Sequence, residues 1–243
     1  MKKIALLIGG LVLFQLIDMV IIYLYPGWQF ILPTPFMVIN SIITNFNLII
    51  TNLIPTLFIT IISIIISIII AYLISFIIKQ YRAYYLINIC GILQIIPPIL
   101  LIPIIINIFG FSFFNTLLIN VILNSFPLIK LISASFLEDN LCQEQLFTTL
   151  NASLINKYRY LYLPRSIKSL YQGLSITITY SLANTLMSEY LIGQSGFGLL
   201  FKHSISNFNI SLAFGIIVII IIITLILLSM IKTIFMWSKY AKI

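Results

Sequence analysis

An apolar run at residues 54–78 constrains the fold of this chain more than any other feature. It consists mostly of Ile, Leu, Ser and Thr, and it carries no charged residue. A run of roughly 20 apolar residues is long enough to cross the hydrocarbon core of a bilayer as one α-helix. Over the whole chain 61% of residues are hydrophobic and 7% are charged, whereas soluble domains carry about 25% charged residues. The sequence therefore predicts an all-α integral membrane protein.

Six transmembrane helices are expected, at about 4–25, 54–78, 85–109, 115–134, 170–190 and 209–236. The first is too long for the apolar core of a signal peptide and no small-residue cleavage site follows it, so we predict an uncleaved helix. Asp18 inside it is either a carboxylate satisfied within the bundle or part of a transport route. Pro97-Pro98 and Pro103 interrupt the third helix, and a kink or break is expected there because proline frees backbone carbonyls.

A proline pair separates the first helix from the rest of the chain. Leu32-Pro33-Thr34-Pro35 stops a helix from continuing, and residues 36–50 are expected to form a short interfacial helix. We divide the chain into residues 1–52, the first transmembrane helix with an external connecting segment, and residues 53–237, one transmembrane domain. The second unit includes a polar loop at 135–169.

The basic residues indicate the orientation of these helices. With six helices and the N-terminus inside, twelve of the thirteen Lys and Arg residues fall in cytoplasmic segments or at cytoplasmic helix ends, and only Lys202 does not. Basic residues favour the cytoplasmic side of a membrane. This predicts a multi-pass protein of a bacterial inner or cell membrane with both termini cytoplasmic. It also explains the net charge of +8 without nucleic acid as a partner.

The one long polar segment runs from Glu138 to Gly173, and the loop at 135–169 that holds most of it is cytoplasmic in this topology. Asp139 or Asn140 can cap a helix that runs from Leu141 to Leu150. Asn151 suits the left-handed turn that ends a helix. A second short helix is expected from Leu154 to Leu161, and Leu163-Pro164 marks the return to the membrane.

This segment resembles the cytoplasmic EAA loop of ABC importer permeases, whose pattern is E-A-A, three residues, Gly, nine residues and I-x-L-P. Leu161-Tyr162-Leu163-Pro164 fills I-x-L-P, and Asn151 then stands at the Gly position, where it keeps the turn possible. Gln145-Leu146-Phe147 stands at E-A-A, so the family's Glu is absent and Glu144 lies one place earlier.

Further motifs of one permease group occur in order over residues 32–200. They are Leu32-Pro33-Thr34-Pro35 for L-P-S-P, Thr56-Leu57 for T-L, Gln94-Ile95-Ile96-Pro97 for Q-x-x-P, and Ser188-Glu189-Tyr190 with Gly196-Phe197-Gly198 for A-E…G-x-G. Their order and spacing are similar to those of the nitrate, sulfonate, taurine and thiamine-precursor permeases.

The resemblance implies a MetI-like type I ABC importer permease fold with six transmembrane helices and a cytoplasmic coupling helix. It implies a second permease copy in a homodimer, two cytoplasmic ABC ATPases and an extracytoplasmic substrate-binding protein. The partner ATPase uses the ATP, and this chain, without G-x-x-x-x-G-K-[ST], is expected to bind no cofactor and to be no enzyme. The expected coupling residues are Glu144, Gln145, Leu146, Phe147, Leu150, Asn151, Leu154, Leu163 and Pro164. Four of them are candidates for an apolar anchor, namely Leu146, Phe147, Leu150 and Leu154.

A row of polar residues marks one face of the fifth helix. Its members are Thr177, Ser181, Asn184 and Ser188, with Glu189 beside them near the outer end. Either they line the route between two permease copies, or small polar residues let the helices pack closely and hydrogen-bond. For Glu189 the second interpretation is a loop or capping carboxylate. The glycines at 193, 196 and 198 are expected in a flexible outer turn, and a single histidine, His203, makes no metal site.

We interpret the chain as the permease subunit of an ATP-driven importer for a small solute that an extracytoplasmic binding protein delivers. A thiamine pyrimidine precursor or similar heterocycle is favoured over a sulfonate, taurine or nitrate, because the outer half of the bundle offers an anion no pathway Lys or Arg. One alternative is an integral membrane enzyme, which needs an acid, base or nucleophile gathered at one depth. The other is a passive channel with a structural cytoplasmic loop.

Overall fold

The computed structural model describes residues 19–22, 24–25, 27, 32–137, 141–192 and 194–237, and these are largely helical, without strands. The helices are α2 (Pro35–Thr44), α3 (Phe46–Tyr81), α4 (Tyr85–Leu93), α5 (Pro98–Phe109), α6 (Phe113–Leu137), α7 (Leu141–Thr149), α8 (Leu154–Lys157), the π-helical turn η2 (Tyr158–Tyr162), α9 (Leu163–Ile192), α10 (Phe197–Ser206) and α11 (Ile210–Trp237). Most of the predicted first helix, with Asp18, and the predicted caps Asp139 and Asn140 lie outside the described residues.

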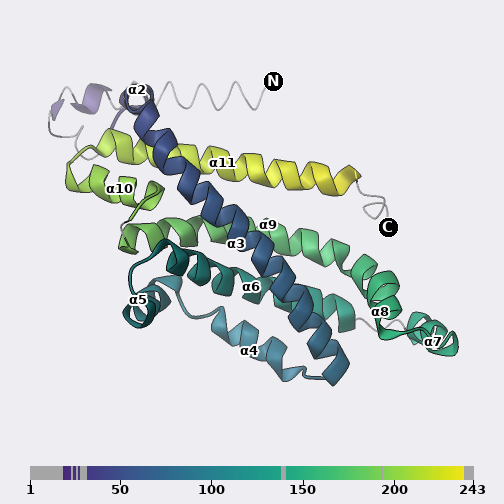
Figure 1. Cartoon of the computed structure of the whole chain (residues 1–243). Coiled ribbons are helices and arrows are strands. Elements are labelled where there is room, and N and C mark those ends of the chain that lie inside the picture. Colours follow the sequence, from purple (N-terminus) through teal and green to yellow (C-terminus); the bar gives the residue numbers. More distant parts are fainter. Residues whose placement is uncertain are drawn as a thin grey trace.

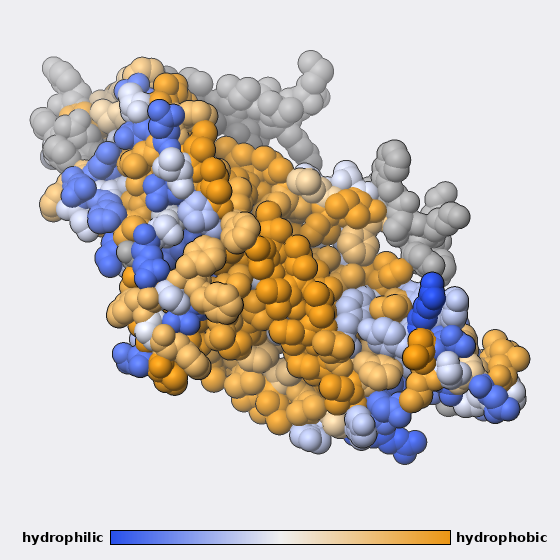
Figure 2. All heavy atoms as spheres, in the orientation of Figure 1, coloured by the Kyte–Doolittle hydropathy of each residue, from blue (hydrophilic) through white to orange (hydrophobic). Residues whose placement is uncertain are grey.

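The long helices form one bundle in which α3 crosses α9 and α11 obliquely (Figure 1). One end of this bundle carries α7, α8 and the C-terminal ends of α3 and α11, and we call it the α7 end. The opposite end carries α2 and α10, and we call it the α10 end. Figure 2 shows hydrophobic residues over the middle of the visible face and polar residues towards both ends. This distribution fits a molecule whose middle contacts hydrocarbon and whose ends contact water.

Three of the described helices, α3, α6 and α11, are long and apolar enough to cross a membrane, and α4 with α5 adds a fourth crossing if the pair is one span. The sequence-predicted helix at 170–190 corresponds to α9, which has 30 residues but is more polar than these spans. A multi-pass helical membrane protein is thus confirmed, and a total of six crossings stays a prediction.

The predicted break in the third helix is confirmed. α4 ends at Leu93 and α5 begins at Pro98, and the two helices are bent by 95°. Pro97 takes an extended conformation before α5. A proline disfavours helical geometry in the residue before it, and proline itself has no N–H to donate. Two consecutive prolines therefore end one helix and start another.

Two of the predicted helix boundaries near the N-terminal side are wrong. The short helix expected over 36–50 ends at Thr44, where α2 stops, and α3 already begins at Phe46. Pro55 lies inside α3, because one missing N–H bends or weakens a long helix without ending it. α3 therefore runs unbroken through residues 52 and 53, where we placed the division between the two units.

The helix after the polar loop also differs from its prediction. α8, η2 and α9 follow one another without a gap, so the second loop helix does not end before Leu163-Pro164. Pro164 has no N–H for the carbonyl of Tyr160, and a π-helical turn directly before it, in which the N–H of Leu163 bonds the carbonyl of Tyr158, accommodates this loss. Gly198 lies inside α10 and not in a turn.

The centre of the bundle is built from α3, α6 and α9, which pack against one another. Small residues allow this close approach. A Cβ at Gly173 of α9 would lie 2.9 Å from a methyl carbon of Leu128 on α6, and Ser133 donates a hydrogen bond to Ser75 across α6 and α3, at 2.8 Å. Close packing and short hydroxyl bonds of this kind hold membrane helices together.

Candidate functional site

The polar loop forms a helix–turn–helix at the α7 end of the bundle (Figure 1). Asn151 has a φ of 47°, which confirms the predicted left-handed turn after α7. The N–H of Ala152 bonds the carbonyl of Phe147 at 3.0 Å, the bond that closes a helix end of this type. Ser153 then caps α8 by accepting from the N–H of Asn156.

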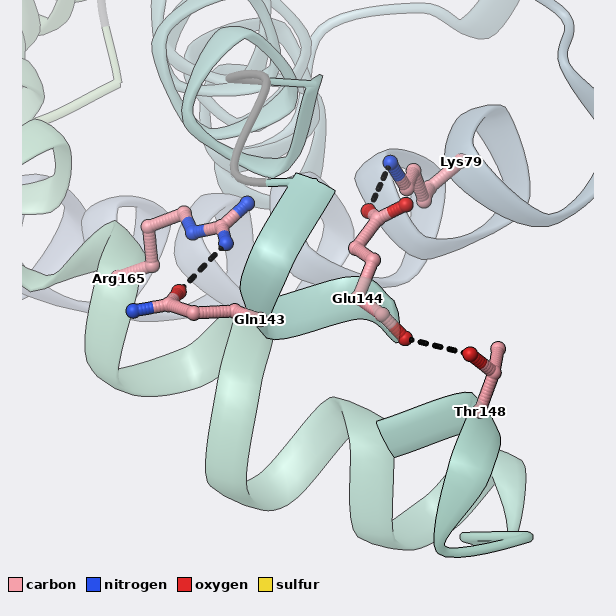
Figure 3. A network of polar contacts seen from close by, with 5 residues as sticks. All are labelled: Lys79, Gln143, Glu144, Thr148 and Arg165. Atoms are coloured by element: carbon pink, nitrogen blue, oxygen red, sulfur yellow. Dashed lines mark hydrogen bonds and ion pairs between the residues drawn. The ribbon is translucent and has the colours of Figure 1, made fainter. Parts of the chain in front are cut away.

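Two polar contacts hold α7 against the membrane helices (Figure 3). The carboxylate of Glu144 lies 2.7 Å from Nζ of Lys79, near the end of α3. Gln143 Oε1 accepts a hydrogen bond from Nη2 of Arg165, in the first turn of α9, at 2.8 Å. The two contacts connect α7 to two of the long helices of the bundle, α3 and α9.

The ring of Tyr162 lies beneath the first of these contacts. Nζ of Lys79 is 5.5 Å from the centre of this ring, and a cation over an aromatic face is attracted to it. Burial raises the pKa of the Tyr162 hydroxyl above its ordinary value, and the Glu144 carboxylate raises this pKa further. Tyr162 is therefore a neutral platform below the ion pair.

Three of the four predicted anchor residues are exposed on the loop. Leu146 is 55% exposed, Leu150 68% and Leu154 52%. Phe147 differs, because it is half-buried and packs against the core at the α7 end, which includes Phe136. The surface open to a partner is therefore narrower than the sequence indicated, and Phe147 joins α7 to the bundle.

The remaining predicted coupling residues fall into two places. Gln145 is exposed on α7, and Leu163 and Pro164 are half-buried at the start of α9. Sequence reasoning missed Ile155, which follows Leu154 and is 76% exposed. An isoleucine in a polar loop is a signal that could have found it.

The predicted polar row on α9 lies inside the bundle. Thr177, Ser181, Asn184, Ser188 and Glu189 are all buried. Oγ of Ser181 lies 3.3 Å from Oγ of Ser63 on α3 and accepts from the amide of Asn124 on α6 at 2.9 Å. These contacts are those expected if the small polar residues let the helices pack closely and hydrogen-bond. A role of the same residues in lining the transport route stays a prediction.

Glu189 joins three helices at the α10 end. Its carboxylate accepts from Oγ1 of Thr56, 2.9 Å away, and from the N–H of Gly198, also at 2.9 Å. The N–H of Phe197 donates to the same Thr56 oxygen at 2.8 Å. A carboxylate at the start of α10 satisfies donors that a helix leaves unpaired, so Glu189 is a capping carboxylate.

The glycines near Glu189 make room for it. A Cβ at Gly196 would lie 2.2 Å from the carboxylate carbon, and one at Gly198 would lie 2.1 Å from the carbonyl oxygen of Leu186. Thr56 thus forms one structural unit with Glu189 and Gly196-Phe197-Gly198, more than 130 positions further along the chain. Within the described residues, no three His, Cys, Asp or Glu side chains gather as a metal site would require.

The model of the family described as "Binding-protein-dependent transport system inner membrane component" matches residues 81–236, more than half of the chain. The chain belongs to this family. The matched range of this inner membrane component includes the loop with α7 and α8, the whole of α9 and α10, and most of α11.

A curated protein and a solved structure are also similar to this inner membrane component. The chain is 27% identical over 128 residues to the formylaminopyrimidine transport permease protein ThiX of Halalkalibacterium halodurans. The matched region is 53% of this chain and 50% of ThiX. The chain thus spans about half the length of that curated relative. A chain from a crystal form of the inward-facing MetNI methionine ABC transporter matches with a TM-score of 0.65 at 17% identity, over 76% of this chain and 94% of that one. The second match supports the MetI-like fold.

Proposed function

We propose that this chain is the transmembrane permease subunit of an ATP-driven importer. We also propose that the loop around α7 and α8 binds a separate ATPase and transmits its conformational change to the membrane helices. The observation that carries the proposal is the arrangement of this loop. Leu146, Leu150 and Leu154 are exposed on it, and polar contacts fix it to α3 and α9. A small apolar cluster of this kind can supply most of the energy of a protein interface.

The orientation follows from where the basic residues lie. Lys79 ends α3, four basic residues lie between 157 and 168, and Lys232 lies near the end of α11, all towards the α7 end (Figure 1). Lys202 on α10 is at the other end. Basic residues favour the cytoplasmic side, so we place the α7 end and both termini in the cytoplasm, where ATP is available.

The partners follow from the family and from this orientation. We propose two cytoplasmic ABC ATPases, a second copy of this chain in a homodimer and an extracytoplasmic binding protein that delivers the solute at the α10 end. ATP binding draws the two α7 elements together. The Lys79–Glu144 and Gln143–Arg165 contacts then transfer this movement to α3 and α9, which biases the permease between inward- and outward-facing states.

For the solute we favour a thiamine pyrimidine precursor or a similar heterocycle. The support is the relative ThiX, whose name assigns it to formylaminopyrimidine transport. A sulfonate, taurine or nitrate is the second candidate, because the sequence motifs occur in permeases for those solutes as well.

The test is capture of the ATPase. The tagged chain in mild detergent should recover a cytoplasmic ABC ATPase, and Leu146→Asp/Leu150→Asp should lose it, because two carboxylates replace the apolar anchor. Thr149→Asp is the matched control, since it adds a carboxylate to an exposed position of the same helix without removing an apolar group. An ATPase that stays bound to the double variant, or none bound to the folded parent, would refute the proposed coupling.

A further inference from the structure

A cavity of about 370 Å³ opens where the break between α4 and α5 faces α6 and α9. Pro98 at the break, Pro127 near the middle of α6 and Tyr180 past the middle of α9 line it. These elements place the cavity between the coupling loop and the α10 end, and its lining residue Asn184 is five positions before Glu189 on α9. Its volume lies within the range of roughly 300–1,000 Å³ that is usual for sites of small ligands.

One polar side chain in this cavity is buried without a partner. Asn184 is 6% exposed and lines the cavity, and none of the described residues forms a hydrogen bond with its amide. Buried amides are nearly always hydrogen-bonded, by protein groups, water or ligand. The donor and acceptor of Asn184 are thus available to a molecule in the cavity.

Three further polar side chains line the same space. They are Gln94 at the helix break, Lys130 on α6 and Tyr180 on α9. The described part of the chain provides no hydrogen bond or ion pair for any of these three side chains. Lys130 is exposed and lies towards the α7 end of α6, so its ammonium group can reach both water and a molecule in the cavity.

Two interruptions of the backbone add to this polarity. Pro127 inside α6 deprives the carbonyl of Leu123, another lining residue, of its helical N–H donor. α5 begins at Pro98 without a side-chain cap, and the start of a helix favours negative or electron-rich groups. Both interruptions are tolerated at membrane depth where backbone lines a cavity.

We propose that this cavity is the solute site of the permease and that it takes a small planar nitrogen heterocycle of the aminopyrimidine class; the solute class rests on the proposed function. A carboxamide offers a donor beside an acceptor and so matches an amino group beside a ring nitrogen, as it does on adenine. Asn184 and Gln94 supply two carboxamides. The rings of Phe126 and Tyr180, both lining residues, can stack on the flat ring of the solute. Lys130 can donate a hydrogen bond to an acceptor oxygen of the solute.

Thiol labelling tests the site without relying on transport. Leu123→Cys is made in the full chain with Cys90→Ala and Cys142→Ala, and the complex with its ATPase is placed in lipid nanodiscs. A water-soluble methanethiosulfonate should label it at least about tenfold faster than Leu128→Cys, because reactivity follows access and Leu128 on the same helix is fully buried and does not line the cavity. Equal labelling of the two positions would show that the cavity is closed to water.

Protection by the solute tests the ligand. Formylaminopyrimidine at ten times its dissociation constant should slow labelling of Leu123→Cys about tenfold, whereas taurine should not. Adding Asn184→Leu should remove the protection, and Asn107→Leu, an exposed amide on α5 outside the cavity, should keep it. Gln94→Leu provides a second cavity variant if Asn184→Leu does not fold.

The outcomes separate this inference from the proposed function. Labelling that formylaminopyrimidine does not slow, in a sample that still binds its ATPase, would overturn the inference and leave the importer role standing. Protection in a chain that binds no ATPase would support the site and refute the importer role. Protection by taurine but not by formylaminopyrimidine would overturn the solute class.

Discussion

Oγ1 of Thr56 on α3 lies 2.9 Å from both carboxylate oxygens of Glu189 on α9, although the two residues are 133 positions apart. The same hydroxyl oxygen accepts from the N–H of Phe197 at the start of α10. One threonine thus connects three helices at the α10 end. This contact is distant from the coupling loop, so it fixes the bundle at the end opposite to the one where we propose the ATPase acts.

We expect Thr56→Val to destabilise the protein by about 1–3 kcal/mol, because it leaves a buried N–H and a buried carboxylate short of a partner. Thr51→Val is the control, since Thr51 is on the same helix and its hydroxyl bonds only to carbonyls of its own preceding turn. Thermal unfolding in detergent measures both. Equal thermal unfolding midpoints for the two variants would show that the Thr56–Glu189 contact contributes nothing to the stability of the protein.

Gly196→Ala should disrupt the α10 end. Its Cβ would overlap the carboxylate of Glu189, and the φ of Gly196 is 99°, a conformation that L-residues rarely adopt. Gly91→Ala is the matched control, because nothing lies within 4 Å of its Cβ and alanine favours the helix. The yield of monodisperse protein should fall for Gly196→Ala alone; a normal yield would mean that α10 shifts freely.

The Lys79–Glu144 pair should matter more for transport than for stability. Both side chains are partly exposed, at 21% and 37%, and ion pairs of this kind contribute about 1 kcal/mol or less. Lys79→Glu and Glu144→Lys should each reduce uptake severalfold, and the two together should restore part of it, because the exchanged charges can pair again. Uptake of labelled formylaminopyrimidine in cells with the complete importer measures this. Additive losses in the double variant would show that the pair does not act as a unit.

Asn151 provides a test of the turn itself. Asn151→Gly should keep ATPase binding, since glycine adopts a φ of 47° without cost, whereas Asn151→Ala should weaken binding, because a left-handed conformation costs about 1–2 kcal/mol for an ordinary residue. Titration of the purified ATPase onto the permease in nanodiscs measures the affinity. Tighter binding to the Ala variant than to the Gly variant would contradict the role of this turn.

The local chemistry of the sequence was sufficient for several features. The length of the apolar runs predicted a helical membrane protein, Pro97-Pro98 predicted the break, and Asn151 predicted the left-handed turn. Each depends on a few neighbouring residues, through hydrophobic length, a missing N–H or an accessible φ. The permease family followed from the order of short motifs, and the match over residues 81–236 confirms it.

Only the tertiary structure decided which distant residues meet. The sequence indicated that Thr177, Ser181, Asn184 and Ser188 share a face, but it did not show that α3 and α6 cover that face. It also gave no sign that Glu144 would find Lys79, or that Asn184 would remain without a partner beside a cavity. Helix periodicity determines which residues lie on one side of a helix, whereas the packing of several helices determines what that side contacts. Burial, pairing and cavities are decided at this second level, and so are the contacts of α7 with α3 and α9 and the cavity beside Asn184.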